Sequence, residues 1–315
     1  MIVSTTNEIL PRHAELIAKE AGVTPHVFSN MEEIPAEVAE QTEVLISFGD
    51  DLTVDSLERF PRLKWIQVIR AGLDNLPSRY VHERGIRVTN ASGIHVTPMS
   101  EYVVLCMLHF EKDMERYRTL KEQKKYDRTK LVGELMGREA LIYGTGVIGK
   151  AVAQMLKVFQ VNVYGVNTSG RPVEPFLETF ALGKEGEVYE RADYVISILP
   201  SSPQTRGLFS AERLNRMKPE AVFISIGRGD VVDENHVVEM LKNGRLKGAA
   251  FDVFQQEPLP EDSPLWECEN LLLTPHMSAK SIYYIDRCVE IFLQNWKALR
   301  NQTPMINVVD TSKEY

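Results

Sequence analysis

Three side chains with complementary chemistry follow three separate apolar runs in the last third of the chain. They are Arg228, Glu257 and His276. A guanidinium is a permanent planar cation that binds a carboxylate through two hydrogen bonds, and an imidazole exchanges a proton near neutral pH. A carboxylate beside the imidazole fixes its orientation and favours its protonated form. Together these groups could protonate the alkoxide that forms when a hydride reaches a keto carbon. Taken singly, they could be a surface arginine, a loop glutamate and a helix-capping histidine.

Each of these side chains comes shortly after a segment with the apolar pattern of a buried β-strand. The predicted strands cover residues 221–226, 249–253 and 271–274. In an open sheet of parallel strands, ligands bind outside the carboxyl ends of the strands. We therefore expect the three loops to converge at one edge of a sheet, around a single carbonyl group.

A glycine-rich turn at residues 144–149 indicates a dinucleotide. It follows the apolar run 140–143 and opens a helical pattern with apolar residues on a period near 3.6. In such a turn the first glycine permits the tight bend, the second lets the backbone approach a pyrophosphate, and the third lets helix pack on strand. Unpaired N–H groups at the helix start face the phosphates. The alternative is an ordinary strand–turn–helix unit. The expected contacts are Gly144, Gly146, Val147, Ile148 and Gly149.

The end of the next predicted strand bears on which dinucleotide binds. NAD-dependent proteins usually carry an acidic residue there, which binds the ribose 2′-hydroxyl. In this chain the position is Asn167, so a 2′-phosphate would meet no repulsive carboxylate. Thr168 and Ser169 can donate hydrogen bonds to that phosphate, and Arg171 can pair with it. These residues favour NADP(H), with NAD(H) as the alternative; the loop could also be polar surface with Arg171 in solvent.

Strand and helix patterns alternate along the chain, which indicates an α/β fold with parallel sheets. We predict a Rossmann doubly wound parallel sheet over residues 99–282 and a smaller flavodoxin-like α/β substrate domain formed by residues 1–98 with 283–315. The strands predicted in the first part are 2–4, 26–28, 44–47, 65–69 and 86–89. The six predicted in the second part are 140–143, 161–166, 194–199, 221–226, 249–253 and 271–274.

Three helical segments bear on how the two domains connect. A helix is predicted near residues 8–21. Thr97-Pro98 predicts the start of one long helix from Met99 to about Glu122, with Thr as N-cap and Pro at the first helical position. A last helix near 282–300 is expected to return to the first domain, which makes that domain discontinuous.

Bulk composition excludes several classes of protein. The chain has 315 residues, 43% of them hydrophobic and 25% charged, as in ordinary soluble domains. A net charge of −8 without a basic run argues against nucleic acid and anionic membrane as partners. No apolar stretch is long enough to span a membrane, and the N-terminus lacks the pattern of a signal peptide. Three scattered cysteines argue against disulfides and a metal site, so we expect a cytosolic protein without metal.

At these motifs the chain resembles the D-isomer-specific 2-hydroxyacid dehydrogenases, over essentially its whole length. The resemblance implies that Arg228 holds the substrate carboxylate and polarises its keto oxygen, that His276 is the general acid–base, and that Glu257 is its partner. Ser225 and Ser197 depart from the residues of many relatives, which blurs the subfamily but leaves the catalytic set intact. The motifs are Arg228-Gly229…Val232-Asp233, Asp252-Val253-Phe254…Glu257-Pro258, Thr274-Pro275-His276 and Val88-Thr89-Asn90…Glu101.

The same resemblance suggests further contacts with cofactor and substrate. It places Leu199, Pro200 and Thr205 under the ribose. Beside the nicotinamide it places Ile226, Arg228 and Asp252, although Asp252 alone could be a helix cap. Gly227 and His276 are further expected contacts with the cofactor. The loop 70–75 looks like the family's substrate loop, with expected contacts from Arg70, Ala71, Gly72 and Leu73.

Four side chains have alternative roles on the substrate side. Arg70 could add a second positive charge suited to a diacid or a polar keto acid, or it could be a surface residue. Phe48 ends another strand that is expected to face the cleft. His95 could reach the cleft, or cap and pack. Tyr126 stands where many relatives carry an aromatic residue contributed by a dimer partner, and we expect a homodimer.

The leading hypothesis is NADPH-dependent reduction of a small 2-keto acid, of the glyoxylate or hydroxypyruvate kind, to the D-2-hydroxy acid. Within the family, the alternative is NAD-linked oxidation of a hydroxy acid, including a phosphorylated one. A phosphorylated substrate would require several basic residues in the substrate cleft, and Arg70 is the one that the sequence motifs identify. From a different class, the alternative is a non-catalytic protein that senses NAD(H).

Overall fold

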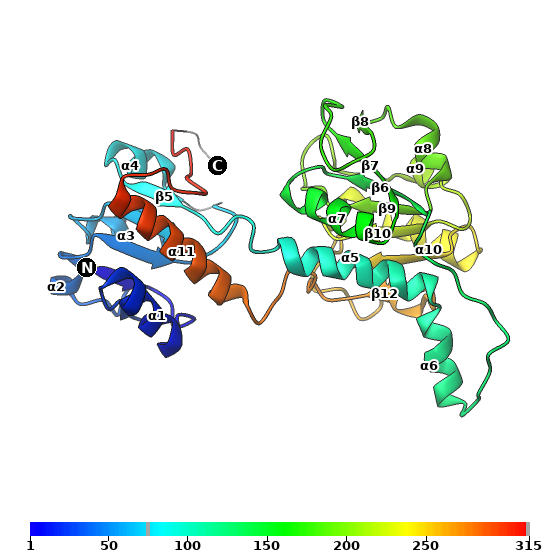
Figure 1. Ribbon diagram of the computed structural model, residues 1–315, viewed down its shortest axis with the longest axis horizontal. Helices are drawn as coiled ribbons and strands as arrows, with labels where there is room; N and C mark the ends of the chain where they lie inside the picture. Colours follow the sequence, from blue (N-terminus) through cyan, green and yellow to red (C-terminus); the bar gives the residue numbers. More distant parts are fainter. Residues whose placement is uncertain (74–75, 313–315) are drawn as a thin grey trace. The chain divides into compact units, whose positions relative to one another are not determined.

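The computed structural model describes residues 1–73 and 76–312, and its elements are labelled in Figure 1. The chain divides into two compact units. The first unit comprises Met1–Ile94 and Ser281–Tyr315, and the second comprises His95–Lys280. The chain therefore passes from one unit to the other at 94/95 and 280/281, where the sequence interpretation had 98/99 and 282/283.

The first unit contains a five-stranded parallel sheet in the order β2-β1-β3-β4-β5. This is the flavodoxin-like strand order, and all five predicted strands are present. The strands are β1 (Ile2–Ser4), β2 (His26–Val27), β3 (Val44–Ser47), β4 (Trp65–Val68) and β5 (Arg87–Thr89). The helices are α1 (Pro11–Ala21), α2 (Ala36–Ala39), α3 (Val54–Glu58), α4 (Ser78–Glu83) and α11 (Tyr284–Asn301).

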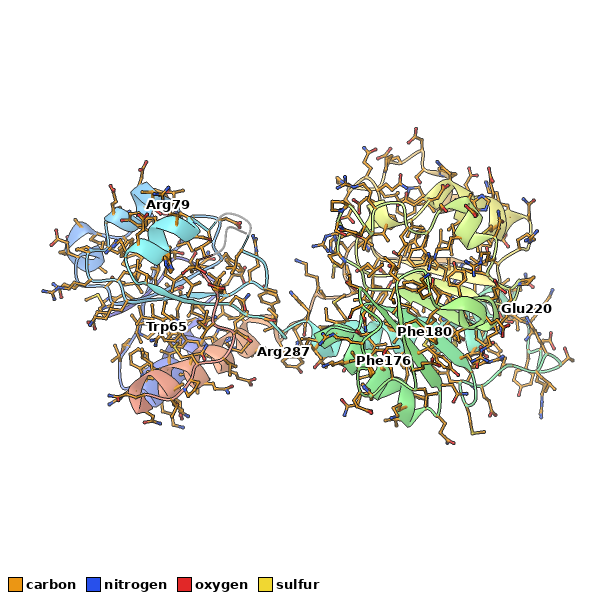
Figure 2. All side chains as sticks on the ribbon, turned by 90° about the horizontal axis from the view of Figure 1, so that it is seen from above. Trp65, Arg79, Phe176, Phe180, Glu220 and Arg287 are labelled. Carbon is orange, nitrogen blue, oxygen red and sulfur yellow. The ribbon has the colours of Figure 1, made fainter. Side chains whose placement is uncertain are left out.

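Helix α11 belongs to the first unit although it follows the second in sequence. Its Phe292 stacks on Trp65 of β4, with ring centroids 5.0 Å apart and planes inclined by 4°. Trp65 and Arg287, another residue of α11, are labelled in Figure 2. The hydroxyl of Tyr284 donates to the Ile69 carbonyl at 2.8 Å. Asp286 accepts from the buried His13 of α1 at 2.9 Å. These contacts show why residues after 280 fold back on the first sheet: their apolar face completes its core.

The second unit contains a seven-stranded parallel sheet in the order β12-β11-β10-β9-β6-β7-β8. Counted from β6, this is the doubly wound Rossmann order, with its topological switch between β6 and β9. The six predicted strands are present, and the sequence interpretation missed β8, a three-residue edge strand that is only half-buried. The strands are β6 (Glu139–Tyr143), β7 (Asn162–Asn167), β8 (Thr179–Ala181), β9 (Tyr194–Ser197), β10 (Val222–Ser225), β11 (Gly248–Phe251) and β12 (Leu271–Leu273).

The long helix predicted over 99–122 is wrong, because the segment forms two helices. Asp113 adopts a left-handed backbone with φ of 52°, which a right-handed helix cannot continue through. The predicted N-cap is also wrong: the first helix begins at Val96 after His95, so Pro98 lies inside its first turn, where a missing N–H costs nothing. The helices of the second unit are α5 (Val96–Glu111), α6 (Met114–Glu122), α7 (Val147–Val158), α8 (Gly186–Arg191), α9 (Ala211–Leu214) and α10 (Glu234–Lys242).

Within the described part of the chain, none of these helices combines the length and apolar character needed to cross a bilayer. Helix α5 is apolar, but eight of its residues are buried inside the second unit. Its apolar character is therefore explained by packing against α7 and the sheet.

Candidate functional site

The glycine-rich turn joins β6 to α7 and leaves its outer side open. Gly144 has a φ of 107°, a conformation that favours glycine. A Cβ on Gly149 would lie 1.8 Å from the Gly144 carbonyl oxygen, so helix and strand approach too closely for any side chain. At Gly146, the N-cap of α7, a Cβ would meet no described atom within 4 Å. Packing therefore requires glycine at 149 but not at 146, where the backbone is open on its outer side.

Asn167 ends β7 and organises the loop that follows. Its side-chain oxygen accepts from the N–H of Ser169 at 3.2 Å and of Gly170 at 2.7 Å. Its amide donates to the Arg171 carbonyl at 3.0 Å. The side chains of Thr168, Ser169 and Arg171 are exposed, and in the described residues the Arg171 guanidinium forms no ion pair. Residues 167–171 therefore offer hydroxyls and a positive charge to a ligand, and carry no carboxylate.

The loop after β9 is closed by its own hydrogen bonds. The Thr205 hydroxyl donates to the Pro200 carbonyl at 2.6 Å and accepts from the Ser202 N–H at 2.9 Å. A Cβ on Gly227 would lie 2.3 Å from the Leu199 carbonyl oxygen, so the loops after β9 and β10 touch. Ile226 is 2% exposed and packs in the core. Thr205 and Ile226 thus shape the loops, and their side chains offer little surface to a ligand.

The three catalytic candidates follow β10, β11 and β12, which are neighbours in the sheet. His276 Nδ1 lies 2.8 Å from Glu257 Oε2, and Glu257 Oε1 accepts from the Phe254 N–H at 3.0 Å. Burial alone would raise the pKa of Glu257, but hydrogen bonds from His276 and Phe254, with the charges of His276 and Arg228, hold that pKa below its ordinary value. The structure therefore brings an imidazole and an ionised carboxylate into contact, with a guanidinium near enough to act on the same carboxylate.

Arg228 is exposed, and among the described residues its guanidinium hydrogen-bonds to a neighbouring backbone oxygen. Its Nη1 donates to the Gly227 carbonyl at 2.8 Å. The rest of the guanidinium fork can bind an anion. Gly229 fixes the position of this arginine, because a Cβ there would lie 1.9 Å from the Phe254 carbonyl carbon. The loops that carry Arg228 and Glu257 are consequently in direct backbone contact.

Buried hydrogen bonds from Asp252 fix the loop that carries His276. Asp252 is fully buried; its Oδ1 accepts from the Thr274 hydroxyl at 2.6 Å and the Met277 N–H at 2.7 Å. Its Oδ2 accepts from the Ser278 N–H at 2.9 Å. His276 itself has a left-handed φ of 54°. The family resemblance assigns Asp252 to the nicotinamide; in this structure its carboxylate braces the turn that presents the imidazole.

The sequence interpretation missed Tyr102, which completes this brace. Its hydroxyl lies 2.6 Å from the Thr274 hydroxyl, and since Thr274 donates to Asp252, Tyr102 donates to Thr274. Burial raises the pKa of Tyr102 strongly, so the phenol stays a neutral donor. Tyr102 lies on α5 and Thr274 after β12, so no local pattern could have linked them. The hydroxyl in the motif Thr274-Pro275-His276 was the one available signal.

A cavity of about 590 Å³ has Glu257 and His276 on its wall. The rest of its lining is apolar apart from Thr274, while the side chains of His276 and Glu257 remain 48% and 37% exposed. The apolar residues are Phe254, Pro258, Leu259, Trp266, Leu273 and Pro275.

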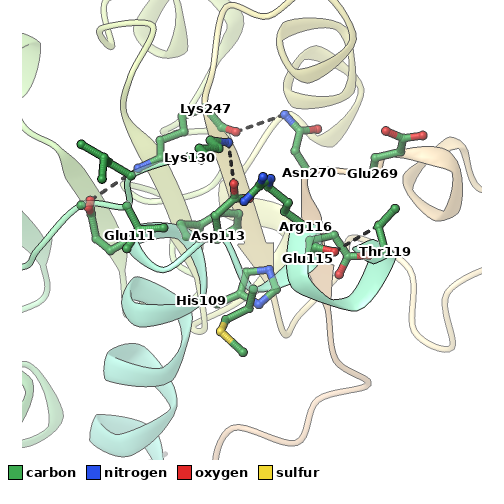
Figure 3. A pocket seen from close by; sticks show the side chains of 15 residues that line it. His109, Glu111, Asp113, Glu115, Arg116, Thr119, Lys130, Lys247, Glu269 and Asn270 are labelled. Carbon is green, nitrogen blue, oxygen red and sulfur yellow. Dashed lines mark hydrogen bonds and ion pairs between the residues drawn. The ribbon is translucent and has the colours of Figure 1, made fainter. Parts of the chain in front are cut away.

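A second cavity, of about 520 Å³, lies beside α5 and α6 (Figure 3). Lys247 and Asn270 on its wall precede β11 and β12, so it lies at the amino edge of the sheet, away from the glycine-rich turn. Its charges already have partners: Glu111 accepts from the Tyr194 hydroxyl at 2.6 Å, and Lys130 pairs with Asp113. These features make it a poor candidate for the dinucleotide.

The predicted substrate residues of the first unit lie around a small recess. Arg70 is not a free cation there, because both its terminal nitrogens bind Asp50. The Ala71 carbonyl accepts from the Asn90 amide at 2.8 Å, which holds the loop to the end of β5. Phe48, Gly72 and Leu73 line the same recess, whereas Asp74 and Asn75 of the predicted loop lie outside the described residues.

Two remaining candidates lie in the second unit. His95 caps the start of α5, and its Nδ1 lies 3.4 Å from the Ala279 carbonyl, so it joins the two points at which the chain enters and leaves this unit. Tyr126 is 93% exposed. Among the described residues, no cluster of His, Cys, Asp and Glu is arranged to hold a metal ion, and the three cysteines are buried and free.

Comparison with known proteins decides the family. The sequence profile described as "D-isomer specific 2-hydroxyacid dehydrogenase, NAD binding domain" matches residues 104–278. The chain belongs to the D-isomer specific 2-hydroxyacid dehydrogenases. Like other members of that family, it is an NAD(P)-dependent oxidoreductase.

Solved structures of this family share the whole fold. A D-isomer specific 2-hydroxyacid dehydrogenase family protein from Aeromonas salmonicida is 30% identical, with a TM-score of 0.78 over 98% of each chain. An NADPH-dependent glyoxylate/hydroxypyruvate reductase from Sinorhizobium meliloti, in complex with NADP and sulfate, is 25% identical, with a TM-score of 0.74 over 100% of this chain and 99% of that one. These similarities confirm the predicted two-domain α/β fold.

Curated relatives carry two different activities. A glyoxylate reductase from Thermofilum pendens is 30% identical over 87% of this chain and 83% of its own length. A D-3-phosphoglycerate dehydrogenase from Methanocaldococcus jannaschii is also 30% identical, over 79% of this chain. The match spans only 48% of that dehydrogenase. Membership of the family therefore fixes the type of reaction and leaves the substrate to be argued from the site.

Proposed function

We propose that this dehydrogenase reduces a small 2-keto acid to the D-2-hydroxy acid, with NADPH as the hydride donor. The observation that carries the proposal is the 2.8 Å contact between His276 and Glu257. Arg228, which is exposed, follows the neighbouring strand at the same edge of the sheet. Arg228 binds the substrate carboxylate through its fork and polarises the keto oxygen. His276 holds a proton at Nε2 and gives it to the developing alkoxide, while Glu257 at Nδ1 stabilises the imidazolium.

The turn after β6 fits the dinucleotide that this reaction needs. Gly146 leaves its backbone open, and the N-terminus of the twelve-residue helix α7 supplies N–H donors and a positive dipole end for a pyrophosphate. The bound nicotinamide supplies a hydride. Gly144, Val147, Ile148 and Gly149 shape this cradle.

The preference for NADPH is supported by the loop after β7. Thr168, Ser169 and Arg171 are exposed donors, and Asn167 replaces the carboxylate that would repel a 2′-phosphate. The variant Arg171→Ala should raise KM for NADPH at least tenfold and leave KM for NADH within twofold, because NADH has no phosphate to lose. Equal losses with both cofactors would count against this role for Arg171.

A homodimer is supported by apolar surface on the arm formed by residues 112–135. Helix α6 buries none of its residues, and the exposed fractions of Tyr126 and Leu131 are 93% and 90%. Apolar side chains this exposed are commonly covered by a partner. We expect sedimentation velocity to give a dimer and the variant Leu131→Asp to shift it toward monomer. A wild-type monomer at micromolar concentration would contradict this assignment. The expected cytosolic location stays a prediction.

Turnover of a keto-acid panel with NADPH and NADH in parallel tests the activity. We expect oxidation of NADPH with glyoxylate, hydroxypyruvate or another 2-keto acid, and its loss in His276→Ala. The same assay run backward with hydroxy acids, including a phosphorylated one, separates reduction from the oxidative reaction named for the phosphoglycerate dehydrogenase relatives. Flat absorbance in both directions, with cofactor binding intact, would favour a non-catalytic sensor of NAD(H) instead.

A further inference from the structure

A forked ion pair joins two loops at the carboxyl edge of the first sheet. Asp50 follows β3 and Arg70 follows β4, whose last residues Ser47 and Val68 are paired in register. Arg70 Nη1 lies 2.6 Å from Asp50 Oδ1, and Nη2 lies 2.9 Å from Oδ2. The bond is thus bidentate, the geometry in which arginine binds a carboxylate most selectively.

This pair removes the positive charge from the start of the predicted substrate loop. Arg70 immediately precedes Ala71, Gly72 and Leu73, and both oxygens of Asp50 are occupied by its guanidinium. The side chains of Arg70 and Asp50 remain 45% and 56% exposed. An incoming anion therefore meets a neutral pair, and can reach Arg70 only by approaching the Asp50 carboxylate as well.

We propose that Asp50 is a specificity-determining residue that restricts this dehydrogenase to 2-keto acids with a single anionic group. The inference rests on the proposed function, together with the predicted contact between loop 70–73 and the substrate. A second carboxylate or a phosphate on the substrate would find no unpaired cation at this loop, because Asp50 occupies the guanidinium fork that would otherwise receive it. Arg70 is thereby withdrawn from the diacid role that its position in the sequence suggested.

Two keto acids of equal chain length test the proposal: 2-oxopentanoate, with one carboxylate, and 2-oxoglutarate, with two. The quantity measured is the ratio of kcat/KM for the second acid to that for the first. In Asp50→Asn, Arg70 is released, and the ratio should rise about tenfold, as expected for one unit charge at short range in a solvated site. The matched control is Asp51→Asn, which removes the same charge from the adjacent residue, whose carboxylate binds Ser47 instead. Its ratio should stay within twofold of wild type.

A second variant moves the ratio in the opposite direction. In Arg70→Gln, Asp50 is left without its counter-charge, so the ratio should fall below the wild-type value. If Asp50→Asn proves unstable by thermal melting, Arg70→Gln still decides the sign. Unchanged ratios in both folded variants, or a rise in Asp51→Asn as large as in Asp50→Asn, would overturn the inference while the proposed function stands.

Failure of the proposed function has a separate signature. Wild-type protein would then turn over no keto acid of the panel with either cofactor. In that case the affinity for 2-oxoglutarate is compared with the affinity for 2-oxopentanoate. Both dissociation constants are measured by titration calorimetry on wild type and both variants. Absence of binding of both acids to all three proteins would overturn the inference too.

Discussion

Replacing Glu257 with glutamine removes a charge beside His276 and keeps an oxygen that can accept the imidazole N–H. The two groups are 2.8 Å apart at their nearest atoms, and their side chains are 37% and 48% exposed, so water weakens the attraction. For charge centres about 4 Å apart and an effective dielectric constant of roughly 40 to 80, the attraction is about 1–2 kcal/mol. Since about 1.4 kcal/mol corresponds to a factor of ten, loss of this attraction should lower kcat/KM about five- to thirtyfold.

The carboxylate of Glu257 acts on the imidazolium, the form that gives its proton to the alkoxide during reduction and that forms again when a hydroxy acid is oxidised. Its loss in Glu257→Gln should therefore lower kcat/KM in both directions. In wild type the lowered pKa of Glu257 keeps the carboxylate ionised in mildly acidic solution, and its contribution is lost only as pH falls through that lowered value.

The assay is kcat/KM against pH in both directions for wild type and Glu257→Gln. The matched control is Glu261→Gln, which removes an exposed carboxylate from the same loop. Its profile should coincide with that of wild type. An unchanged kcat/KM in Glu257→Gln, or a deficit against wild type that does not shrink as pH falls through the lowered pKa of Glu257, would refute the assignment of His276 and Glu257 as the acid–base pair.

Three further substitutions probe the surroundings of the site. Tyr102→Phe removes the hydrogen-bond donor to Thr274 and should lower kcat about five- to tenfold, with KM for the cofactor unchanged. Steady-state kinetics that show only a change in KM would contradict the role of Tyr102 in positioning the His276 loop. Gly149→Ala puts a Cβ against the Gly144 carbonyl and should lower the free energy of unfolding by about 2–3 kcal/mol. Urea unfolding measures this loss, and an unchanged midpoint would contradict the prediction. Asn167→Asp restores the usual carboxylate and should shift the kcat/KM ratio from NADPH toward NADH by more than tenfold; a constant ratio would speak against the proposed phosphate site.

Local sequence patterns were sufficient for the parts of the fold that depend on continuous apolar runs. The strands that precede Arg228, Glu257 and His276 are short apolar runs, and parallel strand order follows from the alternation of strand and helix. The edge strand β8 lacks such a run, because its three residues are only half-buried. The break between α5 and α6 depends on a left-handed Asp113, and no glycine marks it.

Contacts between distant residues account for what local patterns could not predict. Tyr102 and Thr274 are 172 positions apart, and nothing near either residue signals their hydrogen bond. Asp50 and Arg70 each have an ordinary loop sequence, and only the pairing of β3 with β4 brings them together. The sequence therefore predicted which residue types the chemistry needs, while the structure supplied the residues that orient or neutralise them.

The guanidiniums of Arg70, Arg171 and Arg228 differ in a way that bears on substrate choice. The chain carries a net charge of −8, so anionic reactants must be attracted by local positive groups. Within the described residues, Arg228 and Arg171 form no ion pair, and they stand where a substrate carboxylate and a 2′-phosphate are proposed to bind. Arg70, which the sequence offered for a second substrate anion, is already held by Asp50. Each of the two guanidiniums without an ion pair thus corresponds to one anion of the proposed reaction, whereas the guanidinium of Arg70 is already paired and supports no second substrate anion.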